Sequence, residues 1–259
     1  MKKVLLYVLL GVCCYLLFMV LRFPAAPIVA RFDVSPLTLS GVSGPVWNAT
    51  IDTLEAPNDV LPTGPERFRV EQVSWSPAPM QLLAGRGGAH ISFNAYGGQG
   101  EGVVAQSLGG DTHVSDFHYS AEGQALSVLL DPFAKIAGQL AVSVDELVLE
   151  NQVFSSMQAR IEWQDARLLE PTPARLGNLR IDIEPDGDQH TARISAEGGD
   201  VVVNGQVDVQ QNGNYQTDLT IRPRSGAPRE LTDMLRGMGR AASDGSYRIR
   251  RKGNVRRMM

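Results

Sequence analysis

The sequence predicts an all-β protein in which an N-terminal single transmembrane helix is followed by a largely antiparallel β-sheet domain with one or two short amphipathic helices. Three observations predict this fold class. An uninterrupted apolar run extends from Val4 to Leu21. Beyond it, apolar and polar residues alternate with a period of two, which is typical of half-buried strands. An Asn212-Gly213 pair separates two alternating runs, and this is the strongest short-range signal of a β-hairpin.

The apolar run is long enough to cross a bilayer. As a helix it would rise about 27 Å, close to the hydrocarbon thickness of about 30 Å. Lys2 and Lys3 precede the run and Arg22 closes it, a charge bias that favours a cytoplasmic N-terminus. A cleaved signal peptide is the alternative, but its apolar region should be shorter, and Pro27 would obstruct cleavage at the small residues before it. We therefore expect residues 1–22 to be a cytoplasmic N-terminus and a membrane anchor.

Both cysteines of the chain, Cys13 and Cys14, lie inside this run. The residues before them are too large for a lipoprotein cleavage site, so we interpret them as apolar fillers of a membrane helix. The rest of the chain therefore has no disulfide, no cysteine-based zinc site and no cysteine nucleophile. It is large enough to fold without a disulfide.

Charge is unevenly distributed beyond the anchor. Residues 23–239 carry 27 acidic and 14 basic side chains, whereas the last twenty residues carry seven basic side chains against Asp244 alone. The acidic body argues against a nucleic-acid partner. We divide this part into a β-rich domain, residues 23–243, and a terminal strand with a basic tail, residues 244–259. The tail could contact anionic lipid headgroups or an acidic partner, or it could simply be a solvated end.

Alternation predicts the strands in order. The predicted strands are Leu37–Ser40, Val46–Leu54, Phe68–Trp75, Ile91–Ala95, Val144–Leu149, Leu179–Glu184, Ala192–Glu197, Val201–Val209, Tyr215–Ile221 and Tyr247–Arg250. Strands with one wet and one dry face suit an antiparallel sheet. Apolar residues at helical spacing predict short helices within Leu126–Ile136 and within Leu231–Met238, where Pro228 is well placed to open the second. One continuous sheet and two lobes that meet near residues 123–138 both fit this pattern.

The motifs that could carry chemistry favour structural interpretations. The glycines of residues 97–102 lack the context of a phosphate-binding loop, and we interpret them as a flexible turn. His113 and His118 are five residues apart on a predicted strand, so alternation places them on opposite faces and argues against a shared metal. The acidic run of residues 182–188 is interpreted as a charged hairpin tip and not as a calcium loop. We therefore expect no catalytic, metal-ligating or cofactor-binding residue, no small-molecule substrate and no enzymatic activity.

Five segments together resemble a known family. They are residues 39–48 (LSGVSGPVWN), 73–77 (VSWSP), 82–85 (LLAG), 212–215 (NGNY) and 244–249 (DGSYRI), with Gly205 and its flanking valines between them. Their order and spacing, with the anchor and the length, resemble type II secretion system protein N, also called general secretion pathway protein N. The resemblance extends over nearly the whole chain.

This resemblance implies a single-pass protein of the inner membrane of Gram-negative bacteria, with a cytoplasmic N-terminus and a periplasmic C-terminal domain. It implies an accessory role in the type II secretion system, which exports folded proteins from the periplasm across the outer membrane. Its partners would be other inner-membrane components of the machine and, through the anchor, membrane lipid. The family has no known activity or cofactor. The segment at residues 39–47 is also distantly similar to AsmA-like proteins, which makes a periplasmic lipid-binding or lipid-transfer module the alternative.

Six residues are candidates for a contact surface. Trp47 and Trp75 offer large apolar faces, although such side chains more often pack in a core. The other four are Arg248, Arg250, Arg251 and Lys252, in or beside the last predicted strand. A basic terminal strand is either a guarded sheet edge or a strand to which a partner adds its own.

Overall fold

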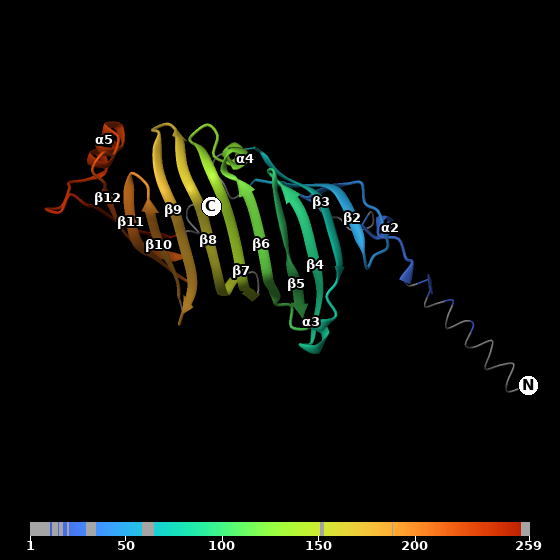
Figure 1. The fold of residues 1–259 in the computed structure, drawn as a ribbon. Helices are drawn as coiled ribbons and strands as arrows, with labels where there is room; N and C mark the ends of the chain where they lie inside the picture. The colour runs from blue at the N-terminus through green and yellow to red at the C-terminus, as the bar shows by residue number, and fades with distance from the viewer. Residues whose placement is uncertain are drawn as a thin grey trace, which may run out of the picture.

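The computed structural model describes residues 11, 15, 18, 19, 21–29, 35–58, 65–150, 153–187 and 189–254. Within them, thirteen strands form one sheet, and each strand is antiparallel to its neighbours in the chain. Figure 1 shows them side by side in chain order. The strands are β1 (Thr38–Ser40), β2 (Ala49–Pro57), β3 (Arg67–Pro77), β4 (Arg86–Ala95), β5 (Gly98–Ser107), β6 (Thr112–Glu122), β7 (Lys135–Glu150), β8 (Val153–Glu170), β9 (Ala174–Asp186), β10 (Gln189–Gly198), β11 (Val201–Gln210), β12 (Asn214–Pro223) and β13 (Tyr247–Asn254). The described helices are α2 (Ala26–Val29), α3 (Met80–Leu83), α4 (Gly123–Leu126), the 3₁₀ turn η1 (Ser127–Leu129) and α5 (Arg229–Met238). The predicted antiparallel all-β domain is confirmed.

The sheet has one apolar and one polar face. Residues that pair directly across an antiparallel ladder point to the same side, so a row of partners can be followed from strand to strand. The apolar row consists of Phe93, Gly100, Tyr119, Val142, Ile161, Ile181, Ile194, Gly205, Leu219 and Ile249. The polar row, on the opposite face, consists of Ser74, Ser92, Glu101, His118, Ser143, Arg160, Asp182, Arg193, Gln206, Asp218 and Arg250.

The described helices lie at the ends of the strands and not over the middle of the sheet (Figure 1). The main core lies at one such end, where Leu231 and Leu235 of α5 are 4% and 2% exposed and pack with Val201 and Tyr247. Elsewhere the large side chains of the apolar row are only half-buried. Within the described part of the chain, no second sheet lies over this face.

The predicted glycine-rich turn is wrong in its extent. Gly98, Gly100 and Gly102 lie inside β5, and only Tyr96 and Gly97 form the turn before it. Aromatic rings explain why a strand needs these glycines. The ring of Phe93, on the neighbouring strand, occupies the place where a β-carbon of Gly100 would lie. A β-carbon on Gly102 would lie 3.0 Å from the backbone of Phe117.

The predicted separation of His113 and His118 is also wrong. Their partners on β5 are Ala105 and Glu101, which are four residues apart on an evenly paired strand, so both imidazoles lie on the same face. The cause is a β-bulge at Asp116, whose φ of +51° inserts one extra residue into β6 and shifts the alternation. The two positions are still about 13 Å apart along the sheet. Among the described residues, no group of histidine, cysteine, aspartate or glutamate side chains could hold a metal ion.

Other local predictions are confirmed or refined. The hairpin around Asn212-Gly213 is β11–β12, and the helix after Pro228 is α5. The helix expected within Leu126–Ile136 is shorter: α4 and η1 end at Leu129, and β7 begins at Lys135. Of the acidic run, Asp182, Glu184 and Asp186 are in β9, and Gly187 is in the turn that follows.

Most of the predicted anchor, residues 1–22, lies outside the described residues. No helix in the described part of the chain is long and apolar enough to cross a membrane.

Candidate interaction surface

The structure separates the six predicted contact residues into two groups at opposite ends of the sheet. Trp47 precedes β2 and Trp75 lies in β3, whereas the four basic residues lie in β13. Ten strand spacings separate β3 from β13, about 48 Å measured along the sheet. The two groups therefore cannot contribute to one small site.

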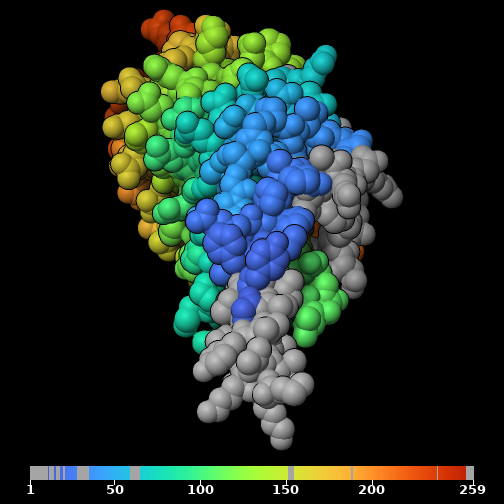
Figure 2. All heavy atoms as spheres, turned by 90° about the vertical axis from the view of Figure 1, so that its right-hand side faces the viewer, coloured from blue at the N-terminus to red at the C-terminus, as the bar shows by residue number. Residues whose placement is uncertain are grey.

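The tryptophan group connects the segment after the predicted anchor to the sheet. The indole Nε1 of Trp75 donates a hydrogen bond of 2.8 Å to the carbonyl oxygen of Val46. The amide of Val46 in turn donates to the carbonyl oxygen of Phe23 at 2.8 Å, and the amide of Ala25 donates to that of Gly44 at 3.0 Å. Figure 2 looks onto this end of the molecule, where the N-terminal described residues lie in front of the later strands. We call residues 23–25, residues 44–46 and Trp75 the N-terminal clamp.

Two glycines give the clamp its shape. Gly44 has a φ of +88°, and a β-carbon there would lie 2.6 Å from the carbonyl oxygen of Asn48. Gly41 has a φ of +69° and packs directly against the side chain of Asp52. Any other residue would be strained at both positions. The segment LSGVSGPVWN thus has a structural role in the clamp, and Trp47, which is 48% exposed, is its large outward-facing side chain.

The basic group lies on the last strand of the sheet. Arg248 donates one hydrogen bond to each carboxylate oxygen of Asp218, at 2.8 and 2.6 Å. Arg250 donates to the same carboxylate at 3.2 Å. Arg251 and Lys252 are exposed and form no ion pair within the described residues. The register places Arg248, Arg250 and Lys252 on the polar face and Arg251 on the apolar one.

The sequence indicates a sheet with one dry face, but it does not show which residues of the strands join into the apolar row. This row crosses ten strands, from β4 to β13. At the β4 end, the ring of Phe93 stacks with the rings of Phe117 and Tyr119, with a distance of 6.2 Å between centroids in each pair. Large contiguous apolar surfaces of this kind mark interaction sites in proteins. The alternation of each strand indicated one dry face, but only the register shows that these faces join.

The polar row is held together by ion pairs. Asp182 accepts hydrogen bonds from Arg180 at 2.7 Å and from Arg160 at 2.8 Å. These two guanidinium groups, that of Arg180 first, lower the pKa of Asp182 from 3.8 to about 2. Beside this group, Arg193 pairs with Glu184.

Asp182 should make the stability of the domain depend on pH in the acid range. Because its pKa is lower in the folded than in the unfolded chain, its contribution is complete above about pH 4 and is lost as the pH falls towards 2. After allowance for solvent screening, we expect a loss of about 1 to 2 kcal/mol. Urea unfolding at several pH values would measure it. Asp182→Asn should flatten the dependence, whereas Asp145→Asn, at an exposed site on β7, should leave it unchanged; equal profiles for the three proteins would refute the assignment.

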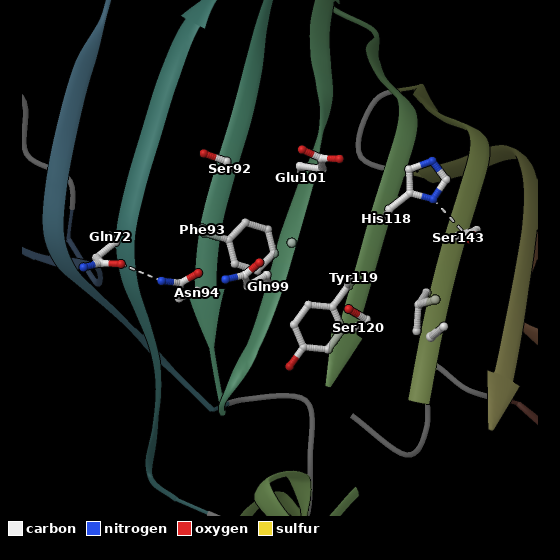
Figure 3. A pocket seen from close by; sticks show the side chains of 13 residues that line it. Gln72, Ser92, Phe93, Asn94, Gln99, Glu101, His118, Tyr119, Ser120 and Ser143 are labelled. Atoms are coloured by element: carbon white, nitrogen blue, oxygen red, sulfur yellow. Dashed lines mark hydrogen bonds between the residues drawn. The ribbon is translucent and has the colours of Figure 1, made fainter. Parts of the chain in front are cut away.

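A shallow hollow of about 590 Å³ lies on the polar face over β3 to β7 (Figure 3). Glu101, His118 and Ser143 lie side by side across three strands, and His118 Nδ1 is 3.3 Å from Ser143 Oγ. This order of acid, imidazole and hydroxyl invites comparison with a hydrolase triad. The imidazole is exposed, however, and no hydrogen bond from it to the Glu101 carboxylate is found among the described residues. The three side chains form part of a solvated polar surface.

The sequence model of the family described as "Type II secretion system (T2SS), protein N" matches residues 35–250. The "Type II secretion system protein N" of Aeromonas hydrophila is 24% identical in an alignment that covers 98% of this chain and 100% of the relative. No solved structure matches the chain with significance. The matches favour the secretion family over the AsmA-like alternative.

Proposed function

The chain belongs to the type II secretion system protein N family, and from this membership we propose that it is an accessory inner-membrane component of the secretion machine. In this role it supports the export of folded proteins from the periplasm across the outer membrane by contacts with other components. The observation that carries the proposal is the match of the family over residues 35–250, which includes all thirteen strands except the last residues of β13.

The character of the sheet supports a role in protein contacts. The apolar row is half-buried at most positions, and the described helices cover only the ends of its face. A partner that covers this face would bury side chains such as Ile161, Ile181 and Ile194, and such burial stabilises a complex by about 25 cal/mol per Å².

The N-terminal segment supports the proposed placement at the inner membrane. Lys2 and Lys3 lie before the apolar run and favour a cytoplasmic N-terminus. Large apolar side chains within the run are exposed where the structure describes them: Tyr15, Phe18, Met19 and Leu21. A bilayer would remove them from water. Because the N-terminal clamp begins at Phe23, the sheet would stand directly at the membrane surface, in the periplasm.

We also propose that the protein acts without catalysis. The polar face carries ion pairs and exposed hydroxyls, and its closest approach to a catalytic group, Glu101–His118–Ser143, lacks an oriented imidazole. A purified domain should show no hydrolysis of ester or peptide substrates above that of a Ser143→Ala variant.

Deletion of the gene would test the proposed function. We expect the secreted substrates of the system to accumulate in the periplasm and to decrease several-fold in the medium, because an accessory component supports export without carrying it out. The tagged full-length protein should restore export and should co-purify with other inner-membrane components. Unchanged export together with no co-purification would contradict the proposal.

Two single substitutions would connect export to the apolar row. Ile194→Glu places a charge in the middle of this row, whereas Asn204→Glu places the same charge on an exposed site of the polar face. Only the first should reduce export. Native mass spectrometry of the gently extracted protein provides a further check, because stoichiometric phospholipid on the wild type and none on Ile194→Glu would favour the AsmA-like function.

A further inference from the structure

The sheet is open, and its two edges differ in length. The edge strand β1 has three residues, whereas β13 at the other edge has eight. Every second residue of an edge strand turns its N–H and C=O groups away from its single partner strand. Such a strand can template the addition of another. Of the two edges, β13 is the one long enough to hold a full additional strand.

The charge of β13 restricts what can pair with it. The strand YRIRRKGN carries four cationic and no acidic side chains. The neighbouring strand supplies one carboxylate within reach, that of Asp218, and Arg248 and Arg250 already share it. The excess positive charge remains at Arg251 and Lys252, near the middle of the strand and on both faces of the sheet.

This charge disfavours a second copy of the chain as the partner. Two β13 strands in antiparallel pairing would bring their arginines and lysines opposite one another, and like charges directly opposite in a sheet destabilise it. Pairing of β13 with β1 of another copy would use only three residues, too few for a stable added strand. An extended segment with acidic side chains has neither disadvantage, since carboxylates would lie within reach of the unpaired cations.

We propose that β13 binds an acidic, extended segment of a partner protein, which adds to the sheet as a further strand. Main-chain hydrogen bonds would supply most of the affinity, and Arg251 and Lys252 would select the acidic sequence. The proposal rests on the proposed function, because it supplies the surface and the chemistry of a contact with the secretion machine. The basic residues of β13 thereby have two roles: they prevent self-association, and they recruit the partner.

Charge reversal tests the selection by charge. The full-length protein, tagged and extracted from its own membrane in mild detergent, would carry Arg251→Glu with Lys252→Glu. A matched control would carry Arg229→Glu with Arg240→Glu, which are exposed residues near the same end of the sheet but outside β13. The amount of other inner-membrane components that co-purifies with the tagged protein should fall about tenfold for the first variant and stay unchanged for the control.

Proline substitution tests the main-chain hydrogen bonds. Arg251 and Lys252 are adjacent, so one of their N–H groups points to β12 and the other points outward. Arg251→Pro and Lys252→Pro should therefore differ: one should lower the unfolding midpoint, and the other should fold like the wild type and still lose the partner. If the variant with wild-type stability still co-purifies with the partner, the proposal that the partner adds a strand to β13 is refuted.

A photoreactive amino acid at position 252 identifies the partner segment. The cross-linked peptide should be acidic, whereas a cross-link to a second copy, or to a neutral or basic segment, would overturn the proposal. Failure of the wild type to co-purify with any component would instead refute the proposed function. Normal co-purification by the charge-reversed protein would refute only the role of β13.

Discussion

Replacement of Gly177 by alanine is expected to lower the free energy of unfolding by about 3 to 5 kcal/mol. Gly177 lies in β9 with a φ of +78°, which is unfavourable for any residue with a β-carbon. A β-carbon would also overlap the carbonyl oxygen of Glu197 and the amide nitrogen of Gly199. Both are backbone atoms, the first near the end of β10 and the second in the turn to β11, so no side-chain rotation can relieve the overlap.

Gly198 provides a matched control for this substitution. It is the direct cross-strand partner of Gly177 and has a similar φ of +84°, but the space around its missing β-carbon is open. Gly198→Ala should therefore cost only the conformational strain, about 1 to 2 kcal/mol. Urea unfolding followed by circular dichroism would give both values. Equal losses would mean that the overlap at Gly177 is relieved by a small backbone shift.

Leu235→Ala should have the second-largest effect, a loss of about 2 to 4 kcal/mol. Leu235 is 2% exposed and belongs to the core cluster with Val201, Leu231 and Tyr247. Because Tyr247 is the first residue of β13, loss of this packing should loosen the last strand before the rest of the sheet. Amide hydrogen exchange should accelerate in β13 more than in β7.

Met234 offers the corresponding control on the same helix. Its side chain is 41% exposed, so Met234→Ala should change the stability by less than about 0.5 kcal/mol and leave exchange in β13 unaltered. If the two substitutions had the same effect, α5 would stabilise this end through its own helicity and not through its buried face.

Local sequence signals predicted those parts of the fold in which the conformational preference of the residues matches the backbone conformation that they adopt. Asn212-Gly213 located the β11–β12 hairpin, and Pro228 with the leucines after it located α5. The predictions fail where contacts with a neighbouring strand determine the local structure. Gly100 and Gly102 disfavour a strand by themselves, but the ring of Phe93 occupies the side-chain space of Gly100, and the backbone and side chain of Phe117 lie close to Gly102.

Bulges account for the other failures. Gln72, Asp116 and Asp165 have φ values near +50° and lie where the pairing register shifts. Each bulge reverses the parity of the residues that follow, so alternation read across it assigns the wrong face. Aspartate tolerates this conformation better than most residues, and an isolated aspartate within an alternating run is the signal that could have indicated two of the three positions.

The candidate contact residues were predictable by chemical type but not by position. A basic last strand and two tryptophans stand out in the sequence. Their separation to the two ends of the sheet depends on the strand order, and so does the continuity of the apolar row between them. The N-terminal clamp was hidden for the same reason, since it joins residues 23–25 to Trp75, fifty residues later.

The strand order also has a consequence for how the domain is made. Because each strand pairs only with the strands immediately before and after it, a chain that emerges from a membrane channel can fold while it emerges. The clamp and first strands would form next to the exit, and each new segment would find its template already in place. Contacts between neighbouring strands close short loops, which favours rapid growth of the sheet from β1 onward. Because β13 pairs only with β12, it is the last of the described strands to find its template, so a partner that binds β13 would bind a sheet that has already been built.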